Sequence, residues 1–588
     1  MSSDERSRTI NELKPLRKYL SGYKTPLIFG GIFVVITNFF ALLGPWVLKF
    51  VVDELQKEIP LQTLIKYAIY ILGIALVEGL FLFLMRQTII GVSRKIEYDL
   101  RNDLFAHLQK QSLSFFNRFK TGDLMARATN DLEAVRQVTG PAIMYSLNTL
   151  ISMVAFIGIM LYIDVRLTLL ALIPFPLMAL VVNRMAKRLH LAYRRIQTQY
   201  AAITSKVQEN LSGIRVVKAY VQEVPEIERF KVLNRDYIRE NLGMAKVRGF
   251  MWASMTFLVG TGTLIILWFG GQLVMRNGIS LGEFVAFFAY LARLTWPMIA
   301  LGWVLNLIQQ GSAAMGRLNR IFQIEPEIAD DEHTGHSVVG VLGEIEFRNV
   351  GFSYNGAPIL KKINLKIEKG MTLAVIGRTG AGKSTLINLI PRLLQADSGE
   401  VLIDGQNITT IPLQLLRKSI GYVPQDTFLF SDTIQENIAF GVDFHSQQEI
   451  EEAATISQIR QDIIDFPQGF ETMLGERGIN ISGGQKQRTA IARAVIRKPS
   501  ILILDDALSA VDTYTEEAIL ARLREVMRQR TSIIVSHRIS TVKDADKIVV
   551  LDQGEIKESG THEELIGLNG IYADIYRKQL LEEAMKSY

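Results

Sequence analysis

The chain of 588 residues contains no cysteine. Disulfide bonds, thiolate metal sites and cysteine nucleophiles are therefore excluded. The first stretch, Met1 to Lys18, is polar and charged and lacks the apolar core of a signal peptide. No low-complexity tract is present. These absences remove the disulfide-stabilised and thiol-dependent classes, but the lack of cysteine does not by itself indicate a compartment.

Hydrophobic composition and a charge asymmetry indicate a membrane region joined to a soluble region. Hydrophobic residues make up 48% of the chain, and the mean hydropathy is +0.19. Residues 1–320 carry 37 Lys and Arg against 21 Asp and Glu, whereas the remainder carries 28 against 38. Positive loops on the cytoplasmic side of a membrane explain the basic half, so no nucleic-acid partner is expected.

Six apolar segments are long enough to cross a bilayer. The tripeptide Asp164–Arg166 alone separates the third from the fourth, which predicts a tight hairpin, and Pro174 and Pro176 predict a kink in the fourth. Before the first segment, Leu13 to Tyr23 is expected to form a short helix at the membrane interface. The six segments lie near residues 26–50, 65–84, 143–163, 167–182, 250–273 and 284–308.

The connections between the segments predict the orientation in the membrane. Two connections, near residues 85–142 and 183–249, are long, helical in periodicity and rich in Lys and Arg, whereas the alternate connections carry little positive charge. The positive-inside rule therefore places both long connections, both termini and the soluble region in the cytoplasm, on the inner side of the cytoplasmic membrane.

A phosphate-binding motif stands in the second half of the chain. Residues 377–384 read GRTGAGKS and satisfy GxxxxGK[ST], between an apolar run and a helical stretch. In this setting backbone N–H groups cradle the phosphates, Lys383 reaches the β- and γ-phosphates, and Ser384 can ligate Mg²⁺. ATP and Mg²⁺ are the expected cofactors. The residues expected to bind ATP here are Gly377, Arg378, Thr379, Gly380, Ala381, Gly382, Lys383, Ser384 and Thr385.

Further motifs follow in a fixed order. Residues 481–485 read ISGGQ, close to the LSGGQ signature of ATP-binding-cassette (ABC) proteins, and an apolar strand ends in Asp505 and Asp506. On these motifs the chain resembles an ABC exporter half-transporter of the multidrug type. The resemblance implies a functional assignment for each motif residue. These residues are Tyr354 (stacking on adenine), Ser384, Gln425 and Asp505 (metal), Asp506, His537 and Gln425 (catalysis), Ser509 and Asp512 (D-loop), and Ser482, Gly483, Gly484 and Gln485 (a signature acting on the partner's ATP).

The resemblance also implies a fold and a domain order. An α-helical membrane domain of six transmembrane helices with long cytoplasmic extensions is expected over residues 1–325. A linker over 326–340 and an α/β P-loop ATPase domain of ABC type over 341–588 follow. Coupling helices are expected near 114–124 and 213–220, where the alternative is ordinary packing within a helical stalk. Residues 475–478 resemble the exporter loop that contacts the membrane domain.

One P-loop, one signature and six spans make half of a transporter, so the chain is expected to dimerise around two ATP molecules. In the resembling family Glu occupies the position of Asp506, whose carboxylate is drawn back by roughly 1.5 Å, one C–C bond. A displacement of about 1 Å can cost on the order of 100-fold in rate. An Asp here often marks the degenerate site of a heterodimer, which we expect. A homodimer with two slow sites, or an Asp that works adequately, stays open.

Polar residues within the apolar spans are candidates for the cargo path, because such groups usually face a bundle interior or water. The resemblance implies ATP-driven export of hydrophobic or amphipathic cargo, multidrug or lipid-like, by alternating access. An ATP-gated channel or regulator on the same architecture is the alternative. Glu78 and Arg293 could instead pair structurally or snorkel to the interface. The candidates are Asn38, Glu78, Asn148, Arg293 and Asn306.

Overall fold

The computed structural model describes residues 9, 11–57, 60–332, 334–335, 340–354, 356–475, 478 and 480–586. These residues form two compact units. The membrane unit comprises residues 1–108 and 121–324, and the nucleotide unit comprises residues 109–120 and 325–588. The boundary after Ile324 lies beside the linker expected from the sequence, whereas residues 109–120 belong to the nucleotide unit although they lie far from it in the chain.

Among the described residues of the membrane unit, six helices are long and apolar enough to cross a bilayer. The fourth is interrupted where its prolines stand, because α9 ends at Leu172 and α10 begins at Pro174. The short helix α2 occupies Leu16–Gly22, within the range where the sequence predicts an interfacial helix. The six candidate spans are Lys24–Leu55, Leu61–Gln109, Thr121–Ile163, Val165–Ser212, Glu223–Met275 and Leu281–Phe322.

Three of these spans, the first, second and sixth, are single long helices, and two others contain short π-helical turns. The third runs from α6 to α8 through two such turns, and the fifth contains a third, η3. The bounds are α3 Lys24–Leu55, α4 Leu61–Gln109, α6 Thr121–Ala126, η1 Arg127–Asp131, α7 Leu132–Gln137, η2 Val138–Ala142, α8 Ile143–Ile163, α9 Val165–Leu172, α10 Pro174–Ser212, α12 Glu223–Ile265, η3 Ile266–Gly270, α13 Gly271–Met275 and α14 Leu281–Phe322.

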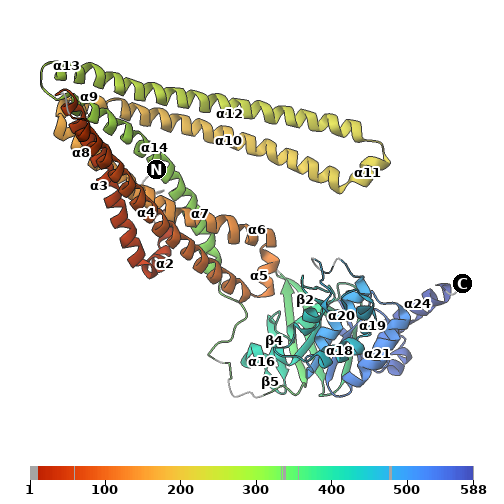
Figure 1. The fold of residues 1–588 in the computed structure, drawn as a ribbon. Helices are drawn as coiled ribbons and strands as arrows, with labels where there is room; N and C mark the ends of the chain where they lie inside the picture. Colours follow the sequence, from red (N-terminus) through yellow and green to blue (C-terminus); the bar gives the residue numbers. More distant parts are fainter. Residues whose placement is uncertain are drawn as a thin grey trace. The chain divides into compact units, whose positions relative to one another are not determined.

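The long connections of the sequence are continuations of the span helices. Helices α10 and α12 lie side by side over their whole length and are joined at their far end by α11 (Ile214–Ala219) (Figure 1). Between them Lys206 pairs with Glu226 at 2.6 Å. The other connection ends in α5 (Leu113–Arg118), next to α6. Both short helices fall where coupling helices are expected.

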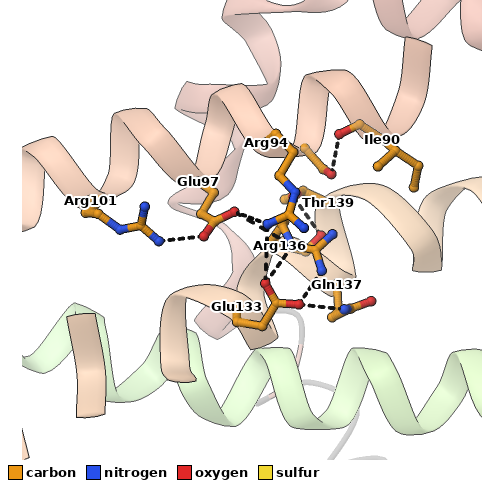
Figure 2. A network of polar contacts seen from close by, with 9 residues as sticks. Ile90, Arg94, Glu97, Arg101, Glu133, Arg136, Gln137 and Thr139 are labelled. Carbon is orange, nitrogen blue, oxygen red and sulfur yellow. Dashed lines mark hydrogen bonds and ion pairs between the residues drawn. The ribbon is translucent and has the colours of Figure 1, made fainter. Parts of the chain in front are cut away.

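The membrane unit also contains a charged network between α4 and α7 (Figure 2). Glu97, 9% exposed, accepts hydrogen bonds from Arg94 at 3.0 Å and Arg101 at 2.6 Å. Arg136, 6% exposed, donates to Glu133 and lies 3.7 Å from Glu97. Some of the basic residues that indicate topology are therefore also fixed structurally by ion pairs.

The nucleotide unit contains two sheets. The larger has strand order β10-β9-β3-β8-β7-β6 and is parallel from β9 to β6, whereas the smaller, β2-β1-β4-β5, is antiparallel. The strands are β1 Ile345–Tyr354, β2 Ala357–Ile367, β3 Thr372–Ile376, β4 Ser398–Ile403, β5 Gln406–Asn407, β6 Ile420–Val423, β7 Ile501–Asp505, β8 Thr531–Val535, β9 Lys547–Asp552 and β10 Glu555–Gly560.

Helices cover both faces of the larger sheet and place its strands in the core. In β7, Ile501 and Ile503 enter the core shared with the smaller sheet, and Leu502 and Leu504 enter the core on the opposite face. A strand buried on both faces is apolar throughout, and this explains why the run ending at Asp505 is so hydrophobic. The helices used below are α15 Lys383–Leu389, α17 Ile434–Ala439, α19 Arg460–Asp465, α20 Gly483–Val495, α21 Thr513–Met527, α22 Ile539–Val542 and α24 Ile571–Lys586.

Candidate nucleotide site

The P-loop connects β3 to α15 and depends on its glycines. Gly377, Gly380 and Gly382 have φ of 159°, 83° and 101°. A Cβ on Gly377 would lie 2.1 Å from the carbonyl oxygen of Leu551, so only glycine fits there. The loop thus brings backbone N–H groups to the start of a helix, where anions are stabilised.

Lys383 and Asp505 are buried charges beside this loop. Lys383, 7% exposed, donates from Nζ to the carbonyl oxygens of Gly377 at 2.9 Å and Arg378 at 3.1 Å. Burial lowers the pKa of the Lys383 ammonium, and Asp505 and Asp506 oppose that shift. Burial raises the pKa of the Asp505 carboxyl, and a hydrogen bond with Ser384 opposes the shift. Both groups carry a desolvation cost that a bound phosphate and cation would relieve.

Asp506 occupies a left-handed backbone position, with φ of 49°. Its N–H donates to the Val535 carbonyl at 2.8 Å, and its own carbonyl accepts from the Ser509 hydroxyl at 2.9 Å. Aspartate adopts this conformation more readily than glutamate because its short side chain can bond locally. The left-handed turn therefore suits an aspartate, and it also limits how far the Asp506 carboxylate can reach.

Two further predicted site residues stand at exposed positions. Tyr354 ends β1, is 40% exposed, and meets Phe352 edge-to-face with 4.8 Å between ring centroids. Because Phe352 supports the Tyr354 ring and the ring is partly exposed, one face of the ring is available to stack on a base. Gln425 follows β6 and is exposed. The neighbouring Tyr422 donates to Asn388 at 2.9 Å, and burial raises its pKa.

The signature forms the start of α20. Ser482 is the N-cap, with its hydroxyl accepting from the Gln485 N–H at 3.2 Å while the Gln485 side chain accepts from the Ser482 N–H at 2.9 Å. Gln485 also donates to Asp462 of α19 at 2.8 Å. Ser482 and Gly483 are exposed. The signature is thus a structured, accessible helix N-terminus, suited to an anion.

A residue that the sequence reasoning missed links the signature helix to the carboxylate turn. Gln487 of α20 is 5% exposed, donates to the Ser509 hydroxyl at 3.0 Å and accepts from the Ala510 N–H at 2.9 Å. Asp512 in turn caps α21 by accepting from the Thr515 N–H at 2.9 Å, and this bond lowers its pKa. No spacing rule singles out Gln487, because its partners Ser509 and Ala510 are brought to it by folding.

His537 lies between β8 and α22, at the end of the strand next to β7. Arg538 beside it forms an ion pair with Glu516, which is 2% exposed and also accepts from Thr541 at 2.6 Å. Burial raises the pKa of the Asp505 carboxyl, and the nearby His537 is among the groups that oppose this shift. The structure therefore gathers the P-loop, the carboxylates and the histidine at the carboxyl ends of neighbouring strands. Of the exporter loop at 475–478, Glu476 and Arg477 lie outside the described residues.

The candidate cargo-path residues of the membrane unit fall into two groups. Asn38 is 5% exposed, and its side chain donates to Asn148 at 2.9 Å and accepts from Ser152 at 2.8 Å, so it bonds α3 to α8. Glu78 and Arg293 form a two-point ion pair at 3.0 and 3.4 Å between α4 and α14. Asn306 is exposed. The contacts of Asn38 suit helix packing, whereas the other group retains exposed polar surface.

Fold and site together define an ATP-binding half-transporter, and comparison with known proteins shows its family. The chain belongs to the ABC transporters: the model of the ABC transporter transmembrane region matches residues 27–298, and the ABC transporter model matches residues 360–509. It is an ABC exporter half-transporter with a helical membrane domain fused to an α/β ATPase domain, and its ATP hydrolysis is coupled to transport. The resemblance and fold class predicted from the sequence are confirmed.

Named relatives cover nearly the whole chain. It is 37% identical, over 97% of its length and 98% of the relative, to the "Probable multidrug resistance ABC transporter ATP-binding/permease protein YheI" of Bacillus subtilis (strain 168). It is 36% identical to the "ATP-dependent lipid A-core flippase" of Syntrophus aciditrophicus (strain SB), over 90% and 87%. A solved bacterial Atm1-family ABC exporter with ATP bound matches with a TM-score of 0.76 and 29% identity, over 96% and 98%.

Proposed function

We propose that this chain exports hydrophobic or amphipathic compounds across the cytoplasmic membrane by alternating access, paired with a second half-transporter that carries the faster ATP site. Relatives named for multidrug resistance and for a lipid A-core flippase support this cargo class. The ATPase domain faces the cytoplasm in this proposal, as the positive-inside pattern predicts. The observation that carries the pairing is Asp506 at the position of the catalytic carboxylate.

In this proposal, ATP binds to hydrogen-bond donors of the P-loop and of Lys383. Lys383 exchanges the carbonyls of Gly377 and Arg378 for the β- and γ-phosphates, and these are stronger partners because both charges are ionised. Backbone N–H groups of the loop hold the remaining phosphate oxygens. Tyr354 stacks on adenine. The other ATP in the dimer lies against Ser482 and Gly483 at the exposed start of α20.

The residues present also fit Mg²⁺. Buried Asp505 and the neighbouring Ser384 hydroxyl offer the oxygen ligands that this ion prefers, and Gln425 can add a third. No group of three acidic, His or Cys side chains that could hold a metal is found among the described residues. When bound, Mg²⁺ would neutralise charge on the phosphates.

Hydrolysis is where this chain is proposed to be weak. Asp506 would polarise the attacking water and His537 would hold the γ-phosphate, but the aspartate reaches about 1.5 Å less far than a glutamate. Its left-handed backbone limits how the turn can move to compensate. The chain would therefore bind ATP firmly, turn it over slowly, and complete the partner's site with its own signature. Closure around ATP would switch the membrane domain to its outward-open state.

The test is ATP turnover of the purified chain alone and of the chain co-expressed with its partner. We expect little turnover alone and fast turnover for the pair. Asp506→Ala should then change the pair's turnover less than about twofold, whereas replacing the partner's catalytic Glu by Gln should nearly abolish it. Robust turnover by the chain alone, lost in Asp506→Ala, would instead make Asp506 the working carboxylate of a homodimer.

Transport itself is measured separately, with sealed vesicles that contain the pair. ATP-dependent accumulation of an amphipathic dye supports a pump, because accumulation against a gradient requires coupling to hydrolysis. Dye leakage that ATP opens in both directions, without accumulation, would show an ATP-gated channel on the same architecture.

A further inference from the structure

The backbone around His537 is held by a side chain from the C-terminal helix. Gln579 of α24 donates from its amide nitrogen to the carbonyl oxygen of His537, and its amide oxygen accepts from the N–H of Ile539 at 2.9 Å. One amide therefore binds the main chain on both sides of Arg538. Two bonds from one planar group fix position and direction together, whereas a single bond would fix only a distance.

The start of α22 depends on this contact. Its N-cap, Arg538, makes no side-chain capping bond, so the first N–H groups of the helix lack the partner that a Ser, Thr, Asn or Asp cap would provide. Gln579 supplies the acceptor for Ile539 from 40 residues further along the chain. The amide thus acts as a cap supplied by another helix.

Helix α24 is itself anchored before it reaches Gln579. Tyr572 is fully buried, donates its backbone N–H to Glu558 at 3.0 Å, and its hydroxyl lies 2.6 Å from Nδ1 of His562. Gln579 lies two helical turns beyond Tyr572 and hence on the same face of the helix. The clamp therefore connects His537 to a fixed point in the core of the nucleotide unit.

The other contacts near His537 act on its neighbours. The hydroxyl of Ser536 accepts from the Arg538 N–H at 3.0 Å, and Glu516 holds the side chains of Arg538 and Thr541. Without Gln579 these contacts would still retain Arg538 and the body of α22. The carbonyl of His537 and the N–H of Ile539 would lose the bonds that set the direction of the histidine.

We propose that Gln579 is a positioning residue for His537, through which the C-terminal helix α24 sets the rate of ATP hydrolysis without contributing to ATP binding. This inference rests on the proposed role of His537 at the γ-phosphate. Loss of the clamp lets the imidazole move by a fraction of its own size, and a displacement of about 1 Å is enough to cost on the order of 100-fold in rate.

The experiment uses the full-length transporter and reads single-turnover hydrolysis of labelled ATP at this chain's own P-loop, with the partner's P-loop lysine replaced where a partner is present. Gln579→Ala should lower the hydrolysis rate by about tenfold or more, while the affinity for a labelled ATP analogue stays within about twofold. Gln579→Glu, which keeps the acceptor and loses the donor, should fall between. Lys578→Ala, on the exposed face of the same helix, is the matched control and should match the unmodified chain.

A double-mutant comparison separates this inference from the site assignment. In a His537→Ala background, Gln579→Ala should cause no further loss, because the group that it positions is gone. A further loss of the same size there, or an unchanged rate in Gln579→Ala alone, would overturn the proposal. Full activity in His537→Ala itself would show that the assignment of His537 is wrong. The proposed role of Gln579 would then fail because the histidine it positions has no role in hydrolysis, and not because Gln579 fails to position it.

Discussion

The buried polar groups beside the P-loop are paired differently from Asn38 between the membrane helices. In the membrane unit, Asn38 of α3 bonds Asn148 and Ser152, both on α8, so its amide is occupied by another helix. In the nucleotide unit, Lys383 bonds only carbonyls of its own loop, and Asp505 has the Ser384 hydroxyl as its neighbour. A polar group satisfied by protein stabilises the fold, whereas one left with spare capacity is available to a ligand.

This difference predicts what each class of substitution should change. Removing a side chain beside the P-loop should reduce ligand binding and leave the fold intact. Removing one from the membrane network should reduce stability and leave the chemistry intact. Each variant below is therefore assayed for both properties, and a variant that changes the opposite property breaks the comparison.

The largest effect is expected for Lys383→Ala. A hydrogen bond to a charged group is worth about 1.5–3 kcal/mol, so loss of the lysine should weaken binding of a labelled ATP analogue by at least about tenfold. The melting temperature of the nucleotide-free protein should not fall, because the substitution removes a charge whose pKa burial already lowers. Lys369→Ala, at an exposed position in the turn before β3, is the control. Unchanged affinity in Lys383→Ala would count against the site.

A smaller loss is expected for Tyr354→Ala. Stacking of a base on an aromatic ring contributes about 1–3 kcal/mol, and the affinity for ATP should fall by the corresponding factor. Tyr354→Phe keeps the ring and should bind as the unmodified chain does. Thermal stability should barely change because the side chain is 40% exposed. If both variants bind ATP equally well, the tyrosine has no stacking role.

The Glu78–Arg293 pair tests the membrane side of the comparison. Arg293→Gln or Glu78→Gln alone leaves one charge without its partner, which costs 3–5 kcal/mol in a fully buried pair. Here 37% of the Arg293 side chain and 25% of the Glu78 side chain are exposed. A loss of stability of about 1–2 kcal/mol is therefore expected for each single variant. The double variant should recover part of the stability. Cargo titrations of ATP turnover would show a path role if a single variant changes the preference between cationic and anionic amphiphiles.

The fold of the nucleotide unit could be predicted from the sequence, and each site residue proposed there is tied to a local motif. The P-loop glycines, the strand ending at Asp505 and the signature all depend on backbone geometry within a few residues. The six spans were likewise predictable from hydrophobicity, and the proline break between Leu172 and Pro174 from the chemistry of proline.

Contacts between distant segments could not be predicted in the same way. Gln487 and Gln579 have no motif that marks them, because each binds main chain that folding brings near from elsewhere. Polar residues in the spans are candidates for a cargo path, but the pairing of Asn38 with Ser152 depends on how α3 and α8 pack, which the sequence does not show. Hydrophobic periodicity predicts that a segment is helical, but it does not predict which other helix the segment packs against.

The smallest effect is expected for Asn38→Leu, which replaces the amide by an apolar group of similar size. Hydrogen bonds between membrane helices contribute about 0.6 kcal/mol on average and at most about 1.7 kcal/mol, so a loss of stability within that range is expected. Asn306→Leu, at an exposed position of α14, is the matched control and should leave stability unchanged. Both variants are assayed for thermal stability and for the cargo concentration that half-saturates ATP turnover. If Asn38 only packs helices, Asn38→Leu lowers stability and leaves that concentration unchanged. A change in the cargo concentration without a change in stability would place Asn38 in the path, and would show that a side chain satisfied by protein can still be reached by cargo.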